Sequence, residues 1–120
     1  MASLVSNRET GNYGENLAVD YLRANGHNII ARNYYTRYGE IDIITNKHNC
    51  IYFYEVKYRK NDGFGSGEEA ISRPKLEKIK KSIAIWISKE SHSFPSEEYF
   101  LNALVLEYSP KLQIIEYEVF

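Results

Sequence analysis

Two runs of β-branched and aromatic residues between Gly39 and Lys60 carry charged side chains at their centres, and this pattern constrains the fold most strongly. The runs flank the polar segment 46–49, so they predict a β-hairpin. A strand of a small domain normally places apolar side chains at its centre, because these must fill the single core. The charges therefore indicate a role other than packing.

Side-chain alternation places these charges relative to one another. Strand side chains alternate between faces, and cross-strand partners share a face. With a four-residue loop at 46–49, Glu40 lies directly opposite Glu55, and Asp42 lies diagonal to Glu55 on the same face as Lys57. A loop of three or five residues would turn one strand over and separate these groups.

Two interpretations of the acidic patch stay open. Opposed carboxylates destabilise a sheet unless a cation lies between them, and Mg²⁺ is normally held by one or two carboxylates, with water and substrate phosphate completing its shell. The patch therefore predicts a hard divalent cation. The alternative is a solvated sheet face on which Lys57 only screens Glu55 and Asp42 is hydrated.

A first helix is predicted over residues 11–25, with Gly26 as a left-handed stop. Glu15 lies at the edge of its apolar face, which is an unusual position for a carboxylate. Two explanations of this position are open, and they do not exclude each other. In one, Glu15 faces the acidic patch. In the other, it is the third helical residue of a capping box with Asn12 as the N-cap.

The remaining pattern predicts a mixed sheet flanked by helices. A second long helix is expected to begin after the N-cap Ser72, with Pro74 in its first turn, and to end before the segment 88–95. Its apolar positions follow the helical period and predict one buried side. These positions are Leu76, Ile79, Ile83, Trp86 and Ile87. Strands are predicted at 28–35, 39–45, 50–60, 99–108 and 112–120, giving an α/β fold of order α-β-β-β-α-β-β.

Charge is distributed unevenly along the chain. The formal net charge of −1 gives no global sign of nucleic-acid binding, but residues 57–81 carry eight basic and four acidic side chains. Phosphate contacts need only such a local patch. A lysine row on a helix is also typical of an ordinary solvated face. The candidate phosphate-binding residues are Arg59, Lys60, Lys75, Lys78 and Lys81, the last three repeating along a predicted solvent-facing side of the second helix.

Length and composition fit one ordinary domain, since 43% of the 120 residues are hydrophobic. Residues 1–10 are polar and expected to be a flexible N-terminus, with residues 11–120 forming the domain. No stretch resembles a signal peptide or a membrane span, so we expect a cytoplasmic protein without membrane contact. Cys50, the single cysteine, excludes an intrachain disulfide. The apolar final strands offer an edge that a homodimer could cover.

The ordered acidic motifs resemble those of a known superfamily. An acid on the first helix, Asp on the second strand and Glu-x-Lys on the third are similar to the PD-(D/E)xK restriction-endonuclease-like superfamily, although Ile41 stands where its name has Pro. A closer resemblance is to the YraN-like family of bacterial proteins. It is carried by Gly11–Glu15, Gly39–Ile44, Glu55–Lys57 with Arg59, Phe64-Gly65, and Ala70-Ile71 with Lys75.

The resemblance implies a restriction-endonuclease-like α-β-β-β-α-β core and a metal-dependent nuclease acting on DNA in preference to RNA. It implies that Glu15, Asp42 and Glu55 bind one or two Mg²⁺ or Mn²⁺ ions, and that Lys57 orients or stabilises the reacting groups. These four are the candidate catalytic residues. Glu40, placed by strand alternation, is expected in an outer shell.

The final strands depart from the family pattern. Members tend to carry an Arg-Phe-Asp-Val stretch where this chain has Phe100-Leu101-Asn102-Ala103, so Asn102 leaves the role of these strands open. Three functions remain in competition: a metal-dependent nuclease, a non-catalytic nucleic-acid-binding accessory protein with the same fold, and an interaction module whose charged hairpin contacts a partner.

Overall fold

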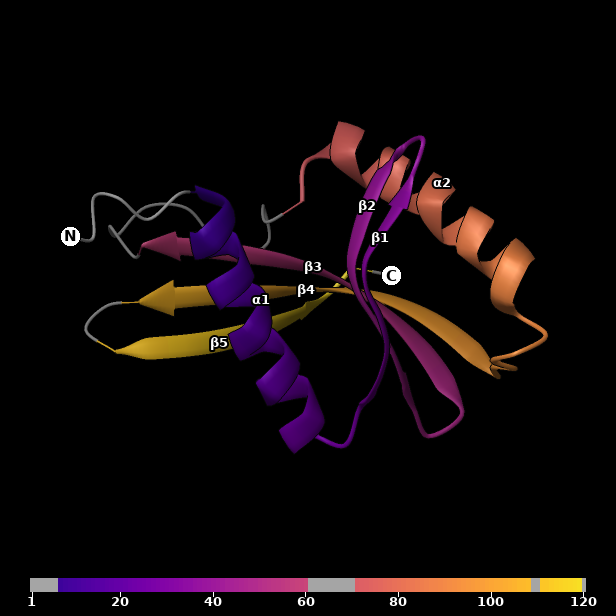
Figure 1. Cartoon of the computed structure of the whole chain (residues 1–120), viewed down its shortest axis with the longest axis horizontal. Helices are drawn as coiled ribbons and strands as arrows, with labels where there is room; N and C mark the ends of the chain where they lie inside the picture. Colours follow the sequence, from indigo (N-terminus) through magenta and orange to yellow (C-terminus); the bar gives the residue numbers. More distant parts are fainter. Residues whose placement is uncertain (1–6, 61–70, 109–110, 120) are drawn as a thin grey trace.

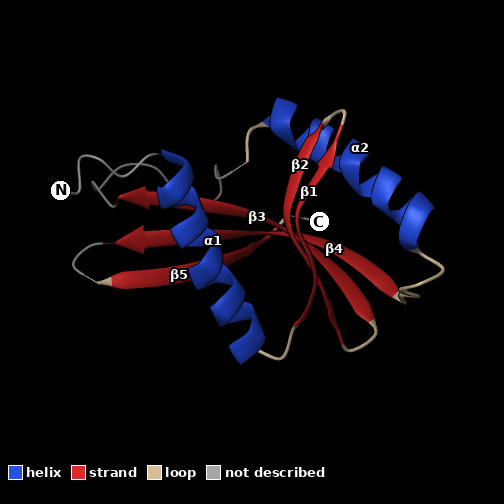
Figure 2. Ribbon diagram, viewed as in Figure 1, coloured by secondary structure: helices blue, strands red, loops and turns tan. Residues whose placement is uncertain are grey.

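A computed structural model describes residues 7–60, 71–108 and 111–119. Within these ranges, five strands form one mixed sheet with a helix on each face (Figure 1, Figure 2). This confirms the predicted α/β fold class. The elements are α1 (Asn7–Ala24), β1 (Asn28–Thr36), β2 (Gly39–Lys47), β3 (Cys50–Lys60), α2 (Arg73–Glu90), β4 (Glu98–Tyr108) and β5 (Leu112–Glu118).

The strands lie in the sheet in the same order as in the chain. The pairs β1–β2, β2–β3 and β4–β5 are antiparallel, whereas β3 and β4 are parallel. Parallel neighbours require a crossover connection, and α2 lies within it. The crossover therefore brings the lysine-rich helix back over the sheet, close to the charged strands.

The two helices cover opposite faces of the sheet and form two separate cores. On one face, α2 packs through Trp86 and Ile83 against Phe53 and its neighbours. On the other, α1 packs through Leu22 against a second group that includes Tyr54. Consecutive residues of β3 thus enter different cores, as strand alternation requires. Neither helix in the described ranges is long and apolar enough to cross a bilayer.

The turn between β2 and β3 is shorter than predicted. Only His48 and Asn49 form it, both with left-handed φ (52° and 62°), as in a type I′ turn. The strands therefore extend to the pair Lys47–Cys50, so the register differs by two residues from the predicted four-residue loop. A shift of two preserves the faces, because side chains alternate with period two.

The corrected register changes which acids are opposed. Pairing of β2 with β3 runs from Lys47–Cys50 to Ile43–Tyr54, and its continuation sets Asp42 opposite Glu55. The prediction that Glu40 opposes Glu55 is wrong. Beyond Ile43, β2 stays paired with β1 and curves away from β3 (Figure 1). The sheet therefore opens at the charged residues.

Helix α1 begins at Asn7, four residues earlier than predicted, and continues to Ala24. Asn12 and Glu15 therefore lie inside the helix, which rules out the capping-box explanation of Glu15. The stop is as expected: Gly26 has φ 88°, and its amide and that of His27 bond back to the last turn. Residues 1–6 and the motif residues Phe64-Gly65 and Ala70 lie outside the described ranges.

Helix α2 follows the predicted pattern closely. The Ser72 hydroxyl accepts a hydrogen bond from the amide of Lys75, and Pro74 occupies the first turn. The helix continues to Glu90, beyond the predicted end. Its buried residues are Ile79, Ser82, Ile83 and Trp86, with Leu76 and Ile87 partly buried.

The two-residue turn predicts an unusual response to glycine. Replacement of Asn49 by glycine should raise the free energy of unfolding by about 0.5–1 kcal/mol, because Asn49 has a left-handed φ that glycine adopts without strain. Replacement of the strand residue Asn46 by glycine is the matched control and should lower the free energy of unfolding by a similar amount. Urea denaturation measures both. If both glycines destabilise equally, the turn is not at 48–49.

Candidate metal centre

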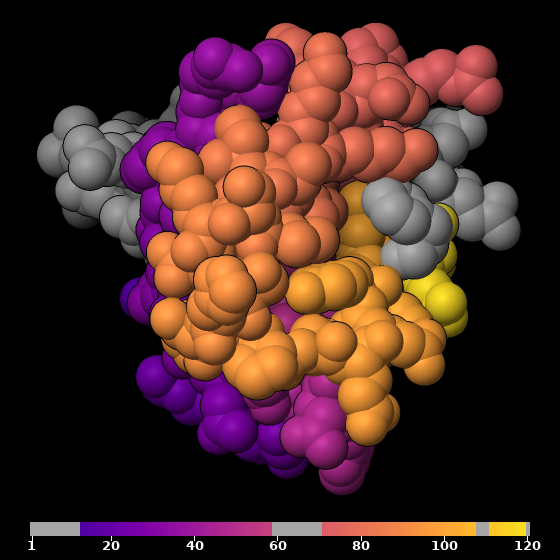
Figure 3. Space-filling model, turned by 90° about the vertical axis from the view of Figure 1, so that its right-hand side faces the viewer, coloured from indigo at the N-terminus to yellow at the C-terminus, as the bar shows by residue number. Residues whose placement is uncertain are grey.

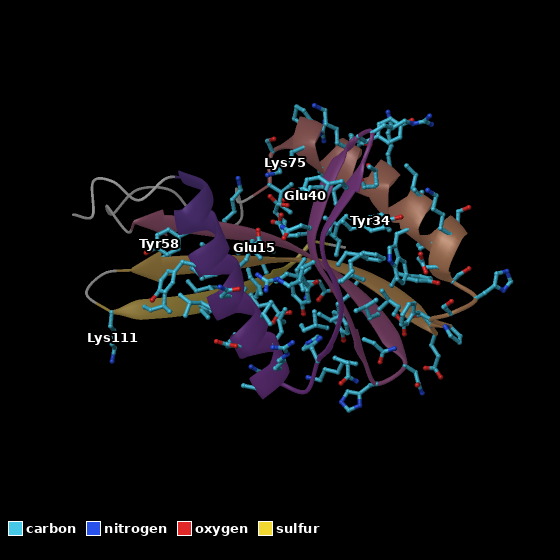
Figure 4. The ribbon with its side chains drawn as sticks, in the orientation of Figure 1. Glu15, Tyr34, Glu40, Tyr58, Lys75 and Lys111 are labelled. Carbon is cyan, nitrogen blue, oxygen red and sulfur yellow. The ribbon has the colours of Figure 1, made fainter. Side chains whose placement is uncertain are left out.

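Three carboxylates converge where β2 leaves the sheet. Glu15 of α1 and Glu40 and Asp42 of β2 each offer an oxygen, and these atoms lie within 4.8 Å of one another. Figure 4 shows Glu15 approaching from the α1 side and Glu40 lying on β2, with Lys75 close by. Residues far apart in the sequence therefore form one acidic group.

Asp42 occupies the point of strand separation. Its side chain is buried, and its Oδ2 accepts a hydrogen bond of 2.7 Å from the backbone N–H of Val56. Val56 lies just beyond the last β2–β3 pair, so its amide has lost the strand partner that a continuous ladder would provide. A buried amide must be satisfied, and here the carboxylate of Asp42 takes the place of the missing strand.

Glu55 is the fourth carboxylate of the site, and it is paired with a lysine. It is 4% exposed, and its Oε1 contacts the Nζ of Lys75 from α2. Lys57 follows two residues after Glu55 on the same face and lies next to Lys75. Two ammonium groups therefore border the acidic group on the α2 side.

Glu15 is held in place by β1. The Nδ2 of Asn33 donates to both carboxylate oxygens, at 2.9 and 3.1 Å, and Arg32 lies 3.9 Å from Oε1. Helix α1 packs on β3 at Gly14, where an added Cβ would make an ordinary contact with the Tyr58 ring at 3.4 Å. The helix and the neighbouring strand together fix the direction of this carboxylate.

The crowding of carboxylates shifts their ionisation. Burial, the charge of Glu55 and the contact with Glu40 raise the pKa of Asp42 to about 9, against the effect of the Val56 hydrogen bond. Burial also raises the pKa of Glu15, opposed by the Asn33 hydrogen bond. Burial lowers the pKa of Lys75, but its hydrogen bond and charge interaction with Glu55 reverse this and raise it. The acidic group needs a proton or another cation for stability.

The donor chemistry fits a hard divalent cation. All three clustered donors are carboxylate oxygens, which Mg²⁺ and Mn²⁺ prefer. Among the described residues, neither a histidine nor the cysteine joins the group. Glu15, Glu40 and Asp42 could hold such an ion, with Glu55 beside them.

Several predicted site residues are placed differently from expectation. Glu40 lies within the close acidic group and not in an outer shell, because β2 bends towards Glu15. Lys75 is half-exposed and its ammonium group contacts Glu55, whereas Lys78 and Lys81 are exposed. Arg59 and Lys60 belong to β3, and their side chains lie outside the described part of the chain.

The sequence predicted Lys75 as a phosphate-binding residue and not as the partner of Glu55, and it did not predict a role for Asn33, although each residue carries a signal. Lys75 lies four residues before the buried Ile79, so the two share a helix face. Asn33 interrupts an apolar strand, where Asn is rare, and its φ of 51° is one that Asn tolerates better than most residues. The sequence alone does not predict the contact of its side chain with Glu15, because that contact depends on how α1 and β1 pack together.

Comparison with known proteins identifies the family. The chain matches the Uncharacterised protein family UPF0102 over residues 14–106. The chain belongs to UPF0102. The matching region contains Glu15, Glu40, Asp42, Glu55 and both lysines of the site. The family assignment agrees with the YraN-like resemblance of the motifs.

UPF0102 relatives cover nearly the same length of chain. A UPF0102 protein of Syntrophomonas wolfei is 40% identical over 84% of this chain and 88% of its own. One of Dictyoglomus thermophilum is 36% identical over 94% and 96%, and one of Vibrio campbellii is 40% identical over 86% and 84%. The likeness therefore extends over the whole acidic site and both helices.

The raised pKa of Asp42 predicts a pH-dependent stability. In the unfolded chain Asp42 ionises near its usual value of 3.8, whereas in the metal-free fold it keeps its proton to about pH 9. Folding must take up a proton between these values, so stability falls as pH rises. Asp42→Asn removes this cost while its amide oxygen still accepts from Val56. At pH 8 it should stabilise the protein by on the order of 2 kcal/mol.

Chemical denaturation in EDTA at pH 4 and pH 8 measures this effect. The stabilisation by Asp42→Asn should largely vanish near pH 4, where Asp42 is protonated in the folded protein and partly protonated in the unfolded protein. Asp20→Asn, at an exposed position of α1, is the control and should change little at either pH. Equal gains for Asp42→Asn at the two pH values would contradict the raised pKa.

Proposed function

We propose that the protein is a metal-dependent nuclease that hydrolyses phosphodiester bonds of nucleic acid. The observation that carries the proposal is the convergence of Glu15, Glu40 and Asp42 within 4.8 Å, beside Glu55 and two lysines. Asp42 in this group is buried and Glu15 and Glu40 are half-buried, so the group is costly for the fold without a cation. Such a cost is typical of a functional site.

The chemistry of the site suits phosphodiester hydrolysis. Glu15, Glu40 and Asp42 would hold one or two Mg²⁺ or Mn²⁺ ions, with Glu55 beside them. A bound ion would supply an activated water and charge stabilisation at the leaving oxygen. Lys57 places a fixed positive charge where negative charge develops on the phosphate.

The substrate approaches along the basic side of the site. Lys78 and Lys81 are exposed on α2, and Arg59 and Lys60 follow Lys57 on β3. These residues supply the local positive charge that phosphates require. DNA, in preference to RNA, is the proposed substrate, and the cytoplasm is the proposed location.

One contact favours the second candidate, a non-catalytic nucleic-acid-binding protein. Lys75 already neutralises Glu55, so part of the acidic charge is balanced without a metal. A protein whose acidic charge is balanced in this way keeps the fold and the basic surface, and it binds nucleic acid without catalysing a reaction. The nuclease stays the first proposal because Glu15, Glu40 and Asp42 are not balanced by Lys75 alone.

Nuclease activity should depend on Asp42 and on divalent metal. Purified protein is expected to cut nucleic acid with Mg²⁺ or Mn²⁺ and not with EDTA, and Asp42→Asn or Lys57→Ala should lower the rate by about a hundredfold or more. Asp20→Asn is the control. The assay uses linear and branched DNA and RNA labelled at one end.

The same preparations distinguish the two candidates. The binding protein predicts salt-sensitive binding that is lost in a Lys78→Ala, Lys81→Ala double variant but kept in Asp42→Asn. These results, together with no cleavage of any substrate, would reject the nuclease. Cleavage that persists undiminished in Asp42→Asn would place the active site elsewhere.

Asn33 should be required for metal affinity through Glu15. Asn33→Ala removes the donor to both oxygens of Glu15, and loss of such a supporting hydrogen bond lowers metal affinity by about tenfold to a hundredfold. Titration with Mn²⁺, followed by electron paramagnetic resonance, measures this. Asn16→Ala, which removes only the acceptor of Arg32, is the control. Equal affinities of the two variants would exclude the positioning role.

A further inference from the structure

A cavity adjoins the acidic site. It has a volume of about 430 Å³ and lies between the tip of the β1–β2 hairpin and the first turns of α2. Glu40 and Lys75 form part of its wall, and both belong to the acidic site. Any group that fills the cavity therefore lies next to the metal-binding carboxylates.

The walls of the cavity are joined by hydrogen bonds through the Thr36 hydroxyl. The Thr36 hydroxyl donates to the carbonyl of Gly39 at 3.1 Å and accepts from the amide of Tyr38 at 3.0 Å. It also lies 2.7 Å from the hydroxyl of Ser82, which is fully buried in α2. Because the Thr36 proton is used on Gly39, Ser82 is the donor. The hairpin tip is thus fixed to α2 (Figure 3), and the cavity is preformed.

The lining combines apolar side chains with two lysines. Tyr38, Pro74 and Ile79 supply apolar surface. Lys75 is engaged by Glu55, whereas Lys78 is exposed and has no ion pair among the described residues. The helix amides offer little, because Pro74 has no N–H and the amide of Lys75 bonds to Ser72. Lys78 is therefore the group that would meet an anion.

We propose that this cavity receives one unpaired nucleotide of the substrate, next to the phosphodiester that is cut. The proposal rests on the proposed nuclease function and names its substrate class. A pocket of this size suits a small ligand, and an intact double helix is too wide to enter. A nucleotide must leave the base stack to fit, which costs least where it is already unpaired. The base lies against the apolar wall, and its phosphate contacts Lys78.

Matched substrates test the preference. A blunt duplex and the same duplex with a one-nucleotide bulge or overhang are compared with Mg²⁺ or Mn²⁺ present. The unpaired substrate should be cut at least about tenfold more efficiently in kcat/KM. Lys78→Glu should abolish this preference and Lys78→Arg should retain it. Lys89→Glu makes the same charge change at the far end of α2 and is the control, which should behave as wild type.

A metal-free experiment separates the cavity from the chemistry. Deoxyadenosine monophosphate is titrated into wild-type protein in EDTA and followed by amide NMR. Shifts should cluster at Tyr38 and Lys78, persist in Lys89→Glu and disappear in Lys78→Glu. Shifts of this kind without cleavage of any substrate would support the cavity and reject the nuclease. Equal cleavage of blunt and unpaired substrates, with no nucleotide shifts, would overturn the cavity proposal and leave the nuclease intact.

Discussion

The hydrogen bond from the Val56 amide to the Asp42 carboxylate is the interaction on which the site depends. Two antiparallel strands can separate inside a domain only if the backbone groups at the fork find other partners. Asp42 supplies one from its side chain at 2.7 Å. This single contact allows β2 to leave β3 and keeps a carboxylate buried at the opening. The acidic residue is thus part of the fold as well as of the site.

The separation of the strands explains why so many charges gather at one point. An uninterrupted sheet would keep α1 and α2 on opposite sides of a continuous layer, and their side chains could not meet. At the fork, Glu15 from the α1 side reaches Asp42 and Glu40, while Lys75 from the α2 side reaches Glu55. The two cores hold the helices in these positions, so apolar packing stabilises an arrangement that charge repulsion opposes.

Much of this arrangement was predictable because it depends on periodicity. The strand faces were correct although the turn was misplaced, since an error of two residues leaves alternation unchanged. The buried side of α2 followed from its apolar spacing. The role of Glu40 could not be predicted, because it depends on how β2 bends after its ladder with β3 has ended. The partnership of Lys75 with Glu55 depends on the parallel crossover, which no local pattern fixes.

Asn102, which departs from the Asp of the family motif, contacts β5 and not the acidic site. Its Nδ2 donates to Glu116 of β5 at 2.6 Å, and the Tyr54 hydroxyl donates to the same carboxylate oxygen at 2.9 Å. An Asp at position 102 would set a second carboxylate against Glu116, and the two would repel each other. Asn102 pairs with Tyr54, so both side chains lie on the α1 face, whereas the adjacent Glu55 points to the α2 face. The departure therefore concerns the attachment of β5, which begins after the region that matches UPF0102, and it lies on the opposite face of the sheet from Glu55.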